Sequence, residues 1–287
     1  MVDKTDIVYS IIVPTIGRKH EISELLSSIK KADIPVPYEI LIIDQNDDGF
    51  LQNSLDDFLS HLPIRVLNVD FKGLSKAKNF GALKAKGEVV SFPDDDCKVF
   101  KDTFETGFET LNRGYDLVFG KCVDEVGEDT VLKFKKEPFE LSTKNMMGGF
   151  VEATVFCKKT VFEKFQFDEN MGAGTFFGAE EGYDWLYRIL SHQESKAFYN
   201  PNIKFYHPPV IADKGDTPAL KRVFTYRCGT AYLCRKHKFL FKYLTRLYMV
   251  FLASMIYKVV DSKKSVYYGV EYHALKLGWL FSKNFLK

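Results

Sequence analysis

Three consecutive carboxylates, Asp94-Asp95-Asp96, follow the apolar run 88–92 (EVVSF) after a single proline. Neighbouring negative charges repel each other unless water or a cation neutralises them. Hard divalent cations such as Mg²⁺ and Mn²⁺ prefer oxygen ligands, of which a protein usually supplies few while phosphate or water supplies the rest. An acidic surface turn is the simpler interpretation. The position after a strand-like run favours the cation site, because ligands bind at strand ends in open α/β sheets.

Two further groups of carboxylates stand at comparable places. Asp44 follows the apolar run 38–43 (YEILII), and here a turn closed by the aspartate's own side chain is the alternative to a ligand contact. Glu180, Glu181 and Asp184 open a helix-like segment. A carboxylate beside a hydroxyl can act as a general base, whereas a carboxylate at a helix N-terminus can serve only to stabilise the helix.

The elements that must position these residues alternate between strand-like and helix-like segments. Apolar runs rich in β-branched residues predict strands, and apolar residues spaced three and four apart predict helices. The predicted strands are 7–13, 38–43, 64–69, 88–92, 115–120, 151–157 and 197–207, and the predicted helices lie around 22–29, 55–59, 74–86, 160–165 and 180–191. This order predicts an α/β fold with a mostly parallel sheet and helices on both faces.

Several motifs occur in a characteristic order along residues 7–210. They are YSIIVPTIGR, YEILIIDQNDDG, GLSKAKNFGALKAKGEVVSFPDDDC, GAGTFFGAEEGYDWLYRIL and FYHP. Together they resemble the nucleotide-sugar glycosyltransferases of the GT-A fold, specifically the large inverting family 2. The resemblance implies a Rossmann-like α/β catalytic domain that transfers a sugar, with UDP-sugars as the expected donors, to a hydroxyl of a glycan or lipid-linked oligosaccharide.

The resemblance also implies a metal site and a donor site. Asp94-Asp95-Asp96 matches the DxD motif, whose last aspartate reaches the Mn²⁺ or Mg²⁺ that bridges the donor diphosphate, so that Asp96, Asp94 and His207 are the expected metal ligands. Donor contacts are expected from Pro14, Thr15, Arg18, Asp44, Asn46, Lys76, Lys78, Asn79, Asp94 and Asp95. Lys78 departs from the family pattern, in which arginine is usual at this position. The planar guanidinium of arginine can form two parallel hydrogen bonds, whereas the ammonium group of lysine is a point charge.

The catalytic base is expected among the carboxylates of the segment 180–191. Glu181 is the first choice, with Asp184 and Glu180 behind it, and Gly182 stands where the family carries its usual catalytic aspartate. On the acceptor side, the resemblance assigns Gly148, Gly149, Phe150 and Trp185. The glycines can equally be turn formers, and a lone histidine such as His207 can equally be structural.

The composition of the chain is that of a folded globular protein. With 46% hydrophobic, 15% aromatic and 27% charged residues over 287 positions, the chain is not disordered, collagen-like or built on disulfides. The five cysteines are an odd number without a CxxC pair, which favours a reducing cytoplasm. The N-terminus lacks the order of a signal peptide. The uncharged run 247–257 is shorter than the roughly 20 residues of a membrane span, so no conventional transmembrane helix is expected.

Charge divides the chain in two. The net charge is +2, yet residues 219–258 carry nine Lys or Arg and no acid. We therefore expect a catalytic domain over 1–218, with a donor half over about 1–100 and an acceptor half over about 101–218, followed by a helical region over 219–287. Basic and aromatic residues interleaved in this way favour a peripheral contact with the inner face of the cell membrane. A helix packed on the catalytic domain with a solvated basic face is the alternative.

Other function classes fit less well. The acidic clusters disfavour nucleic acid as a partner, because they would repel a polyanion. A nucleotidyltransferase needs a glycine-rich basic loop after the first strand, and PTIGRKH offers one glycine. A noncatalytic nucleotide-sugar or glycan binder of the same fold stays open, because Gly182 and Lys78 both depart from the family pattern.

Overall fold

The computed structural model describes residues 8–209, 214 and 216–286; Ile7, the first residue of the predicted N-terminal strand, lies outside them. The chain forms two compact units. The larger unit comprises Met1–Lys72, Lys76–Gln166 and Trp185–Val210, and the smaller comprises Gly73–Ser75, Phe167–Asp184 and Ile211–Lys287. Residues 167–184 thus group with the C-terminal helices, although the sequence gives no sign of this.

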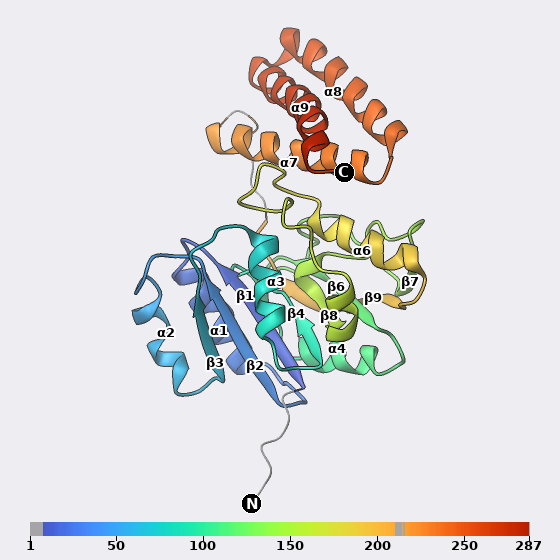
Figure 1. The fold of residues 1–287 in the computed structure, drawn as a ribbon. Helices are drawn as coiled ribbons and strands as arrows, with labels where there is room; N and C mark the ends of the chain where they lie inside the picture. Colours follow the sequence, from blue (N-terminus) through green and yellow to red (C-terminus); the bar gives the residue numbers. More distant parts are fainter. Residues whose placement is uncertain (1–7, 210–213, 215, 287) are drawn as a thin grey trace, which may run out of the picture. The chain divides into compact units, whose positions relative to one another are not determined.

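In the described residues, one nine-stranded sheet forms the centre of the larger unit (Figure 1). Its strands are β1 (Tyr9–Thr15), β2 (Tyr38–Asp44), β3 (Ile64–Asn68), β4 (Val89–Ser91), β5 (Lys98–Val99), β6 (Leu117–Val123), β7 (Phe139–Leu141), β8 (Val155–Lys158) and β9 (Ala197–Tyr206). The strand order is β3-β2-β1-β4-β8-β6-β9-β5, with β7 also on β9. The first four strands are parallel, β6 and β9 are parallel to each other, and β8, β5 and β7 pair antiparallel to their neighbours.

Helices cover both faces of this sheet. The helical elements before the C-terminal region are α1 (His20–Lys31), α2 (Gln52–Leu59), α3 (Leu74–Lys84), α4 (Thr103–Leu111), η1 (Glu152–Thr154), α5 (Lys159–Lys164) and α6 (Glu181–His192). Residues of α1 and α4 cluster with Tyr9, Ile11 and Val13 on one face of β1. On the other face α3 lies so close that a Cβ on Gly81 would be 2.4 Å from Ile12 Cγ2. These two layers confirm the predicted α/β architecture.

Parallel pairing brings the acidic clusters to the same edge of the sheet. β1 and β2 end in register at the pair Thr15 and Asp44. β4 pairs with the other side of β1 and leads directly into the acidic turn. The carboxyl ends of these strands therefore lie side by side, as parallel strands require.

The smaller unit contains three long helices, α7 (Thr217–Lys236), α8 (Leu240–Val260) and α9 (Ser262–Phe281), and the short η2 (Ser282–Asn284). α7 begins where the Asp216 carboxylate accepts a hydrogen bond from the Ala219 amide at 2.6 Å, a normal N-cap. Glycines permit close approach inside this unit. A Cβ on Gly229 would lie 2.5 Å from the Ala179 carbonyl oxygen, and one on Gly278 would lie 2.6 Å from Cys228 Cα.

Helix α8 is apolar on its inner and its outer face. Tyr243 and Val250 are buried, and the Tyr243 ring stacks on Trp279 of α9 at 4.2 Å between centroids. The outer face exposes large apolar side chains: Leu240, Phe241, Leu244, Tyr248, Met249, Leu252, Met255, Ile256 and Val259. Among the described residues, this 21-residue helix alone has the length and composition to cross a bilayer. The expectation against a spanning helix rests on the uncharged run alone, whereas α8 extends beyond that run and includes Arg246 and Lys258.

All five cysteines are buried and unpaired as disulfides. Burial raises the pKa of every one of their thiols, to about 12 for Cys228 and about 11 for Cys234. These cysteines therefore behave as small apolar core residues.

Candidate active site

The acidic turn after β4 is held by an arginine from the loop after β1. Arg18 Nη1 lies 2.6 Å from Asp95 Oδ1 and 2.7 Å from Asp96 Oδ2. Asp95 is buried, whereas Asp94 and Asp96 are half-buried. Burial raises the pKa of Asp95 above its ordinary value, although the charge of Arg18 and its hydrogen bond act in the opposite direction. A buried carboxylate that keeps its charge needs such a partner.

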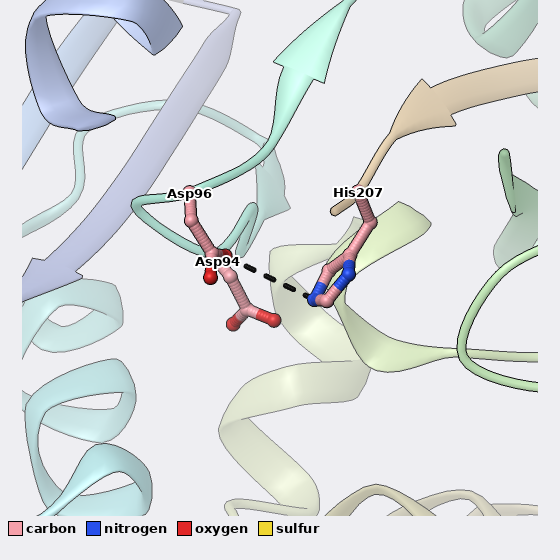
Figure 2. A group of neighbouring side chains, drawn as sticks. All are labelled: Asp94, Asp96 and His207. Carbon is pink, nitrogen blue, oxygen red and sulfur yellow. Dashed lines mark ion pairs between the residues drawn. The ribbon is translucent and has the colours of Figure 1, made fainter. Parts of the chain in front are cut away.

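Asp94, Asp96 and His207 lie close enough to share one cation (Figure 2). Each offers one ligand atom, and these atoms all lie within 4.8 Å of one another. Asp96 Oδ1 is 3.9 Å from His207 Nε2. This oxygen is buried and has no hydrogen-bond partner among the described residues, which is costly unless a ligand satisfies it. The donor set therefore fits a divalent metal.

The surroundings of His207 suit a ligand. β9 ends one residue before it, and its backbone amide donates to the Val123 carbonyl at 3.0 Å. Its Nδ1 lies 2.8 Å from the Pro208 carbonyl oxygen. A proton on Nδ1 is donated to that carbonyl and leaves the lone pair of Nε2 directed at Asp96, as in metal-binding histidines.

A second cation reaches the same turn from α3. Lys78 is fully buried, and its Nζ lies 3.7 Å from Asp94 Oδ1 and 3.5 Å from Glu152 Oε1. Sequence reasoning missed Glu152, because it lies in the predicted strand 151–157 and no motif marks it. Four carboxylates thus face two cations, Arg18 and Lys78. Counted as formal charges, four carboxylates and two cations leave two negative charges, which is the charge that a divalent ion neutralises.

Glu181 begins α6 in the smaller unit and is 7% exposed. The glycine-rich loop lies against it: a Cβ on Gly172 would be 3.2 Å from Glu181 Cδ and 2.8 Å from Ser75 Oγ. Gly172 also has φ +100°, a conformation that favours glycine. The loop is anchored at Ser75, whose hydroxyl donates to the Met171 carbonyl at 2.7 Å.

The other two candidate bases are engaged in the packing of the smaller unit. Asp184 is fully buried and lies 2.9 Å from Lys236 Nζ and 2.8 Å from His237 Nε2. Glu180 has φ +73°, and its Oε1 accepts a hydrogen bond from the Thr230 hydroxyl at 2.9 Å. These contacts favour structural roles for both, and Glu181 as the base stays a prediction from the sequence.

The chain matches the family model described as Glycosyl transferase family 2 over residues 10–178, which is more than half of its length. The protein belongs to glycosyltransferase family 2. It is 31% identical over 204 residues to the GalNAc(5)-diNAcBac-PP-undecaprenol beta-1,3-glucosyltransferase of Campylobacter jejuni, a match that covers 66% of this chain and 62% of the relative. An uncharacterized glycosyltransferase of Haemophilus influenzae is 28% identical over 63% of this chain and 61% of its own. The chain thus spans less than two thirds of these curated relatives.

Solved structures share the fold at low identity. TarS 1-349 of Staphylococcus aureus in complex with UDP-GlcNAc has a TM-score of 0.60 and 14% identity, over 97% of this chain and 92% of that one. The mannosyltransferase PcManGT of Pyrobaculum calidifontis in complex with GDP-Man and Mn²⁺ has a TM-score of 0.56 and 14% identity, over 96% and 73%. These likenesses confirm the GT-A fold expected from the sequence.

Four of the residues expected to contact the donor lie at the end of β1 and on α3. Pro14 and Thr15 are buried, and Lys76 is exposed with its Nζ 4.4 Å from the centre of the Phe71 ring. Asn79 is buried in α3.

Asp44 forms the local turn that was the alternative to a ligand contact. Its Oδ1 accepts hydrogen bonds from the Asn46 amide at 2.9 Å and from Asn46 Nδ2 at 2.7 Å. Asn46 Oδ1 in turn accepts from the Gly17 amide at 2.6 Å. This chain of bonds ties the loop that carries Arg18 to the end of β2, so the turn helps to position the donor side.

The predicted acceptor-side residues are packing residues. Trp185 is fully buried between Phe119 and Phe162 and donates to the Phe165 carbonyl. Phe150 is buried against Phe119. Gly149 is buried too, and a Cβ there would be 2.5 Å from Phe139 Cζ. Gly148 has φ +79° and is a turn former. The acceptor contacts of Trp185 and Phe150 stay predictions. The burial of these two side chains was not predicted, because a short motif does not show which side of a helix or loop is covered.

Proposed function

We propose that this protein is an inverting, metal-dependent glycosyltransferase that moves a sugar from a nucleoside-diphosphate donor, a UDP-sugar, to a hydroxyl of a glycan or lipid-linked oligosaccharide. The observation that carries the proposal is the cluster of Asp94, Asp96 and His207, in which the Asp96 Oδ1 lacks a hydrogen-bond partner among the described residues. Both Mn²⁺ and Mg²⁺ suit such ligands. TarS binds UDP-GlcNAc and PcManGT binds GDP-Man with Mn²⁺ in their structures, which supports a nucleotide-sugar donor here.

The reaction is a direct displacement at the anomeric carbon of the donor sugar. Glu181 is the proposed general base, which accepts the proton of the acceptor hydroxyl. A bond forms from the acceptor oxygen to the anomeric carbon as the bond from that carbon to the phosphate oxygen breaks, and its electron pair leaves with the diphosphate. A metal held by Asp94, Asp96 and His207 would supply Lewis-acid stabilisation of that leaving charge. Lys78, which is fully buried, helps to hold Asp94 and Glu152 in place.

A lipid-linked acceptor is the favoured class. The Campylobacter jejuni relative is named for an undecaprenol-diphosphate acceptor. In the smaller unit, α8 carries no acidic residue, and it combines an exposed apolar face with exposed Lys242 and Lys258. A helix of this kind lies in the headgroup region of an anionic membrane, where the cations meet the lipid phosphates. The protein would then work at the inner membrane face in the assembly of a cell-surface polysaccharide such as capsule or O-antigen.

A thermal-shift experiment on the full chain tests the donor and metal sites. UDP-, GDP-, dTDP- and CMP-sugars are added with Mn²⁺ or with EDTA to the wild type, to Asp96→Asn and to the control Asp57→Asn, which changes an exposed aspartate of α2. A ligand at a hundred times its Kd stabilises the native state by about 2.7 kcal/mol. We expect a metal-dependent rise in Tm of several degrees with one nucleotide class, kept by Asp57→Asn and lost by Asp96→Asn. Equal shifts in all three proteins would refute the metal assignment.

Turnover separates the transferase from a binder of the same fold. The transferase releases the nucleoside diphosphate when donor, metal and acceptor are present. A noncatalytic binder would show the metal-dependent shift in Tm and release no nucleotide with any acceptor.

A further inference from the structure

Arg18 contacts the carboxylates of the acidic turn without covering the atoms that a metal would need. Its Nη1 binds Asp96 through Oδ2, while Oδ1 of the same carboxylate faces His207 Nε2. It also binds Asp95, which is buried and belongs to the middle of the turn. One guanidinium therefore links the two adjacent negative charges that would otherwise repel each other most strongly.

Arg18 is also free to leave. Its side chain is 41% exposed, whereas Lys78, the other cation of the cluster, is fully buried. The backbone before Arg18 is tied down, since the Gly17 amide donates to Asn46 Oδ1 at 2.6 Å, so only the Arg18 side chain needs to move. A planar guanidinium that binds two carboxylate oxygens is equally suited to bind two phosphate oxygens. The donor diphosphate thus competes with Asp95 and Asp96 for the same side chain.

We propose that Arg18 is the resident counter-ion of the metal site, which holds Asp95 and Asp96 while no metal is bound and makes tight metal binding depend on the nucleotide diphosphate. This inference rests on the metal site of the proposed function. With Arg18 in place the cluster retains two negative charges, and without it the cluster retains three. A divalent ion is attracted more strongly to the second arrangement, because the interaction grows with the product of the charges. When the diphosphate draws Arg18 away, the full attraction becomes available to the metal.

The test measures Mn²⁺ binding to the full chain by isothermal titration calorimetry, with and without UDP. Arg18→Gln removes the charge and keeps a similar size, and Arg18→Lys keeps the charge. Arg113→Gln removes an exposed arginine elsewhere in the larger unit and is the matched control. We expect Arg18→Gln to bind Mn²⁺ alone roughly tenfold tighter than the wild type. Because coupling is reciprocal, UDP should then improve Mn²⁺ binding by a correspondingly smaller factor. Arg18→Lys and Arg113→Gln should behave like the wild type.

A double variant shows whether a changed Mn²⁺ affinity in Arg18→Gln comes from the lost charge or from misfolding. Arg18→Gln with Asp95→Asn removes one positive and one negative charge, so the cluster keeps its two negative charges, and Mn²⁺ affinity should return to the wild-type value. An unchanged Mn²⁺ affinity in Arg18→Gln, or a double variant as tight as Arg18→Gln, would overturn the counter-ion role while leaving the metal site intact. A wild type that binds no Mn²⁺ with or without UDP would remove the metal site of the proposed function, and this inference with it.

Discussion

Two carboxylates of helix α6 stand one turn apart and differ in what surrounds them. Asp184 is fully buried and lies within hydrogen-bond distance of Lys236 and His237, and protonating it would weaken both interactions. Glu181 lies beside the loop residue Gly172, whose missing side chain leaves room for it. A general base must gain and lose a proton in each turnover, which suits Glu181 and not Asp184.

Exchange of each carboxylate for its amide separates the two roles. Glu181→Gln should keep donor affinity and lose a factor of roughly 10² to 10⁴ in turnover, the usual contribution of a positioned base. Asp184→Asn should mainly lower the free energy of unfolding, by about 1–3 kcal/mol, because a buried interaction is weakened. Donor titration, product release and thermal melts measure these quantities. If Asp184→Asn melts like the wild type and cannot transfer sugar, Asp184 is the base.

At the level of elements, the sequence predicts those that repeat a simple pattern. β1 and β2 are runs of buried apolar residues and were predicted within two residues of their ends. Helix α4 was not predicted, because Gly107 and buried threonines interrupt its apolar spacing; a Cβ on Gly107 would lie 2.4 Å from Phe156 Cζ, so the glycine serves packing. The two- and three-residue strands β5 and β7 are too short to show alternation.

The candidate site also contains residues that the sequence predicts and residues that it does not. Asp94, Asp96 and His207 were predicted as one group by resemblance, and the structure brings their side chains together. Glu152 and its contact with Lys78 were not predicted, because the two residues meet through the fold and share no motif. The burial of Trp185 was not predicted either, since exposure depends on what packs against a helix.

Segment 167–184 is joined to α7 by a half-buried ion pair that should respond to pH. Asp168 lies 2.6 Å from Lys236 Nζ and 3.0 Å from the Tyr232 hydroxyl. Burial alone would raise the pKa of Asp168, but the hydrogen bond and charge of Lys236 outweigh it and lower that pKa. The folded state therefore holds this proton less tightly than the unfolded state, whose aspartates titrate near pH 3.9. The stabilisation is present above that pH and is lost as pH falls through the lowered pKa.

Thermal melts between pH 6 and pH 3 check this sign. Asp168→Asn should lower Tm at pH 6, and the difference from the wild type should shrink as the pH falls below about 4. Asp57→Asn, at an exposed position of α2, should show no such convergence. A Tm difference that stays constant down to pH 3 would mean that Asp168 acts through its shape and not its charge.

For the whole molecule, the exposed face of α8 predicts binding to anionic bilayers. Replacing Phe241, Leu244 and Tyr248 together by serine should abolish most co-sedimentation of the full chain with vesicles rich in anionic lipid. The matched control replaces Leu83, Val126 and Met147, which are exposed apolar residues of the larger unit, and should bind like the wild type. Raised salt should weaken binding through screening of the lysines. If the α8 variant instead turns a dimer into a monomer and still binds vesicles, the face joins two copies of the chain.

Because all five cysteines are buried, the folded chain should react slowly with thiol reagents. Thiolate is the reactive form, and burial raises the pKa of these thiols, so little thiolate exists at neutral pH. A cysteine introduced at Val259, which is 91% exposed on α8, would be the one accessible thiol. An environment-sensitive fluorophore attached there would respond to the change from water to hydrocarbon without removal of any native cysteine.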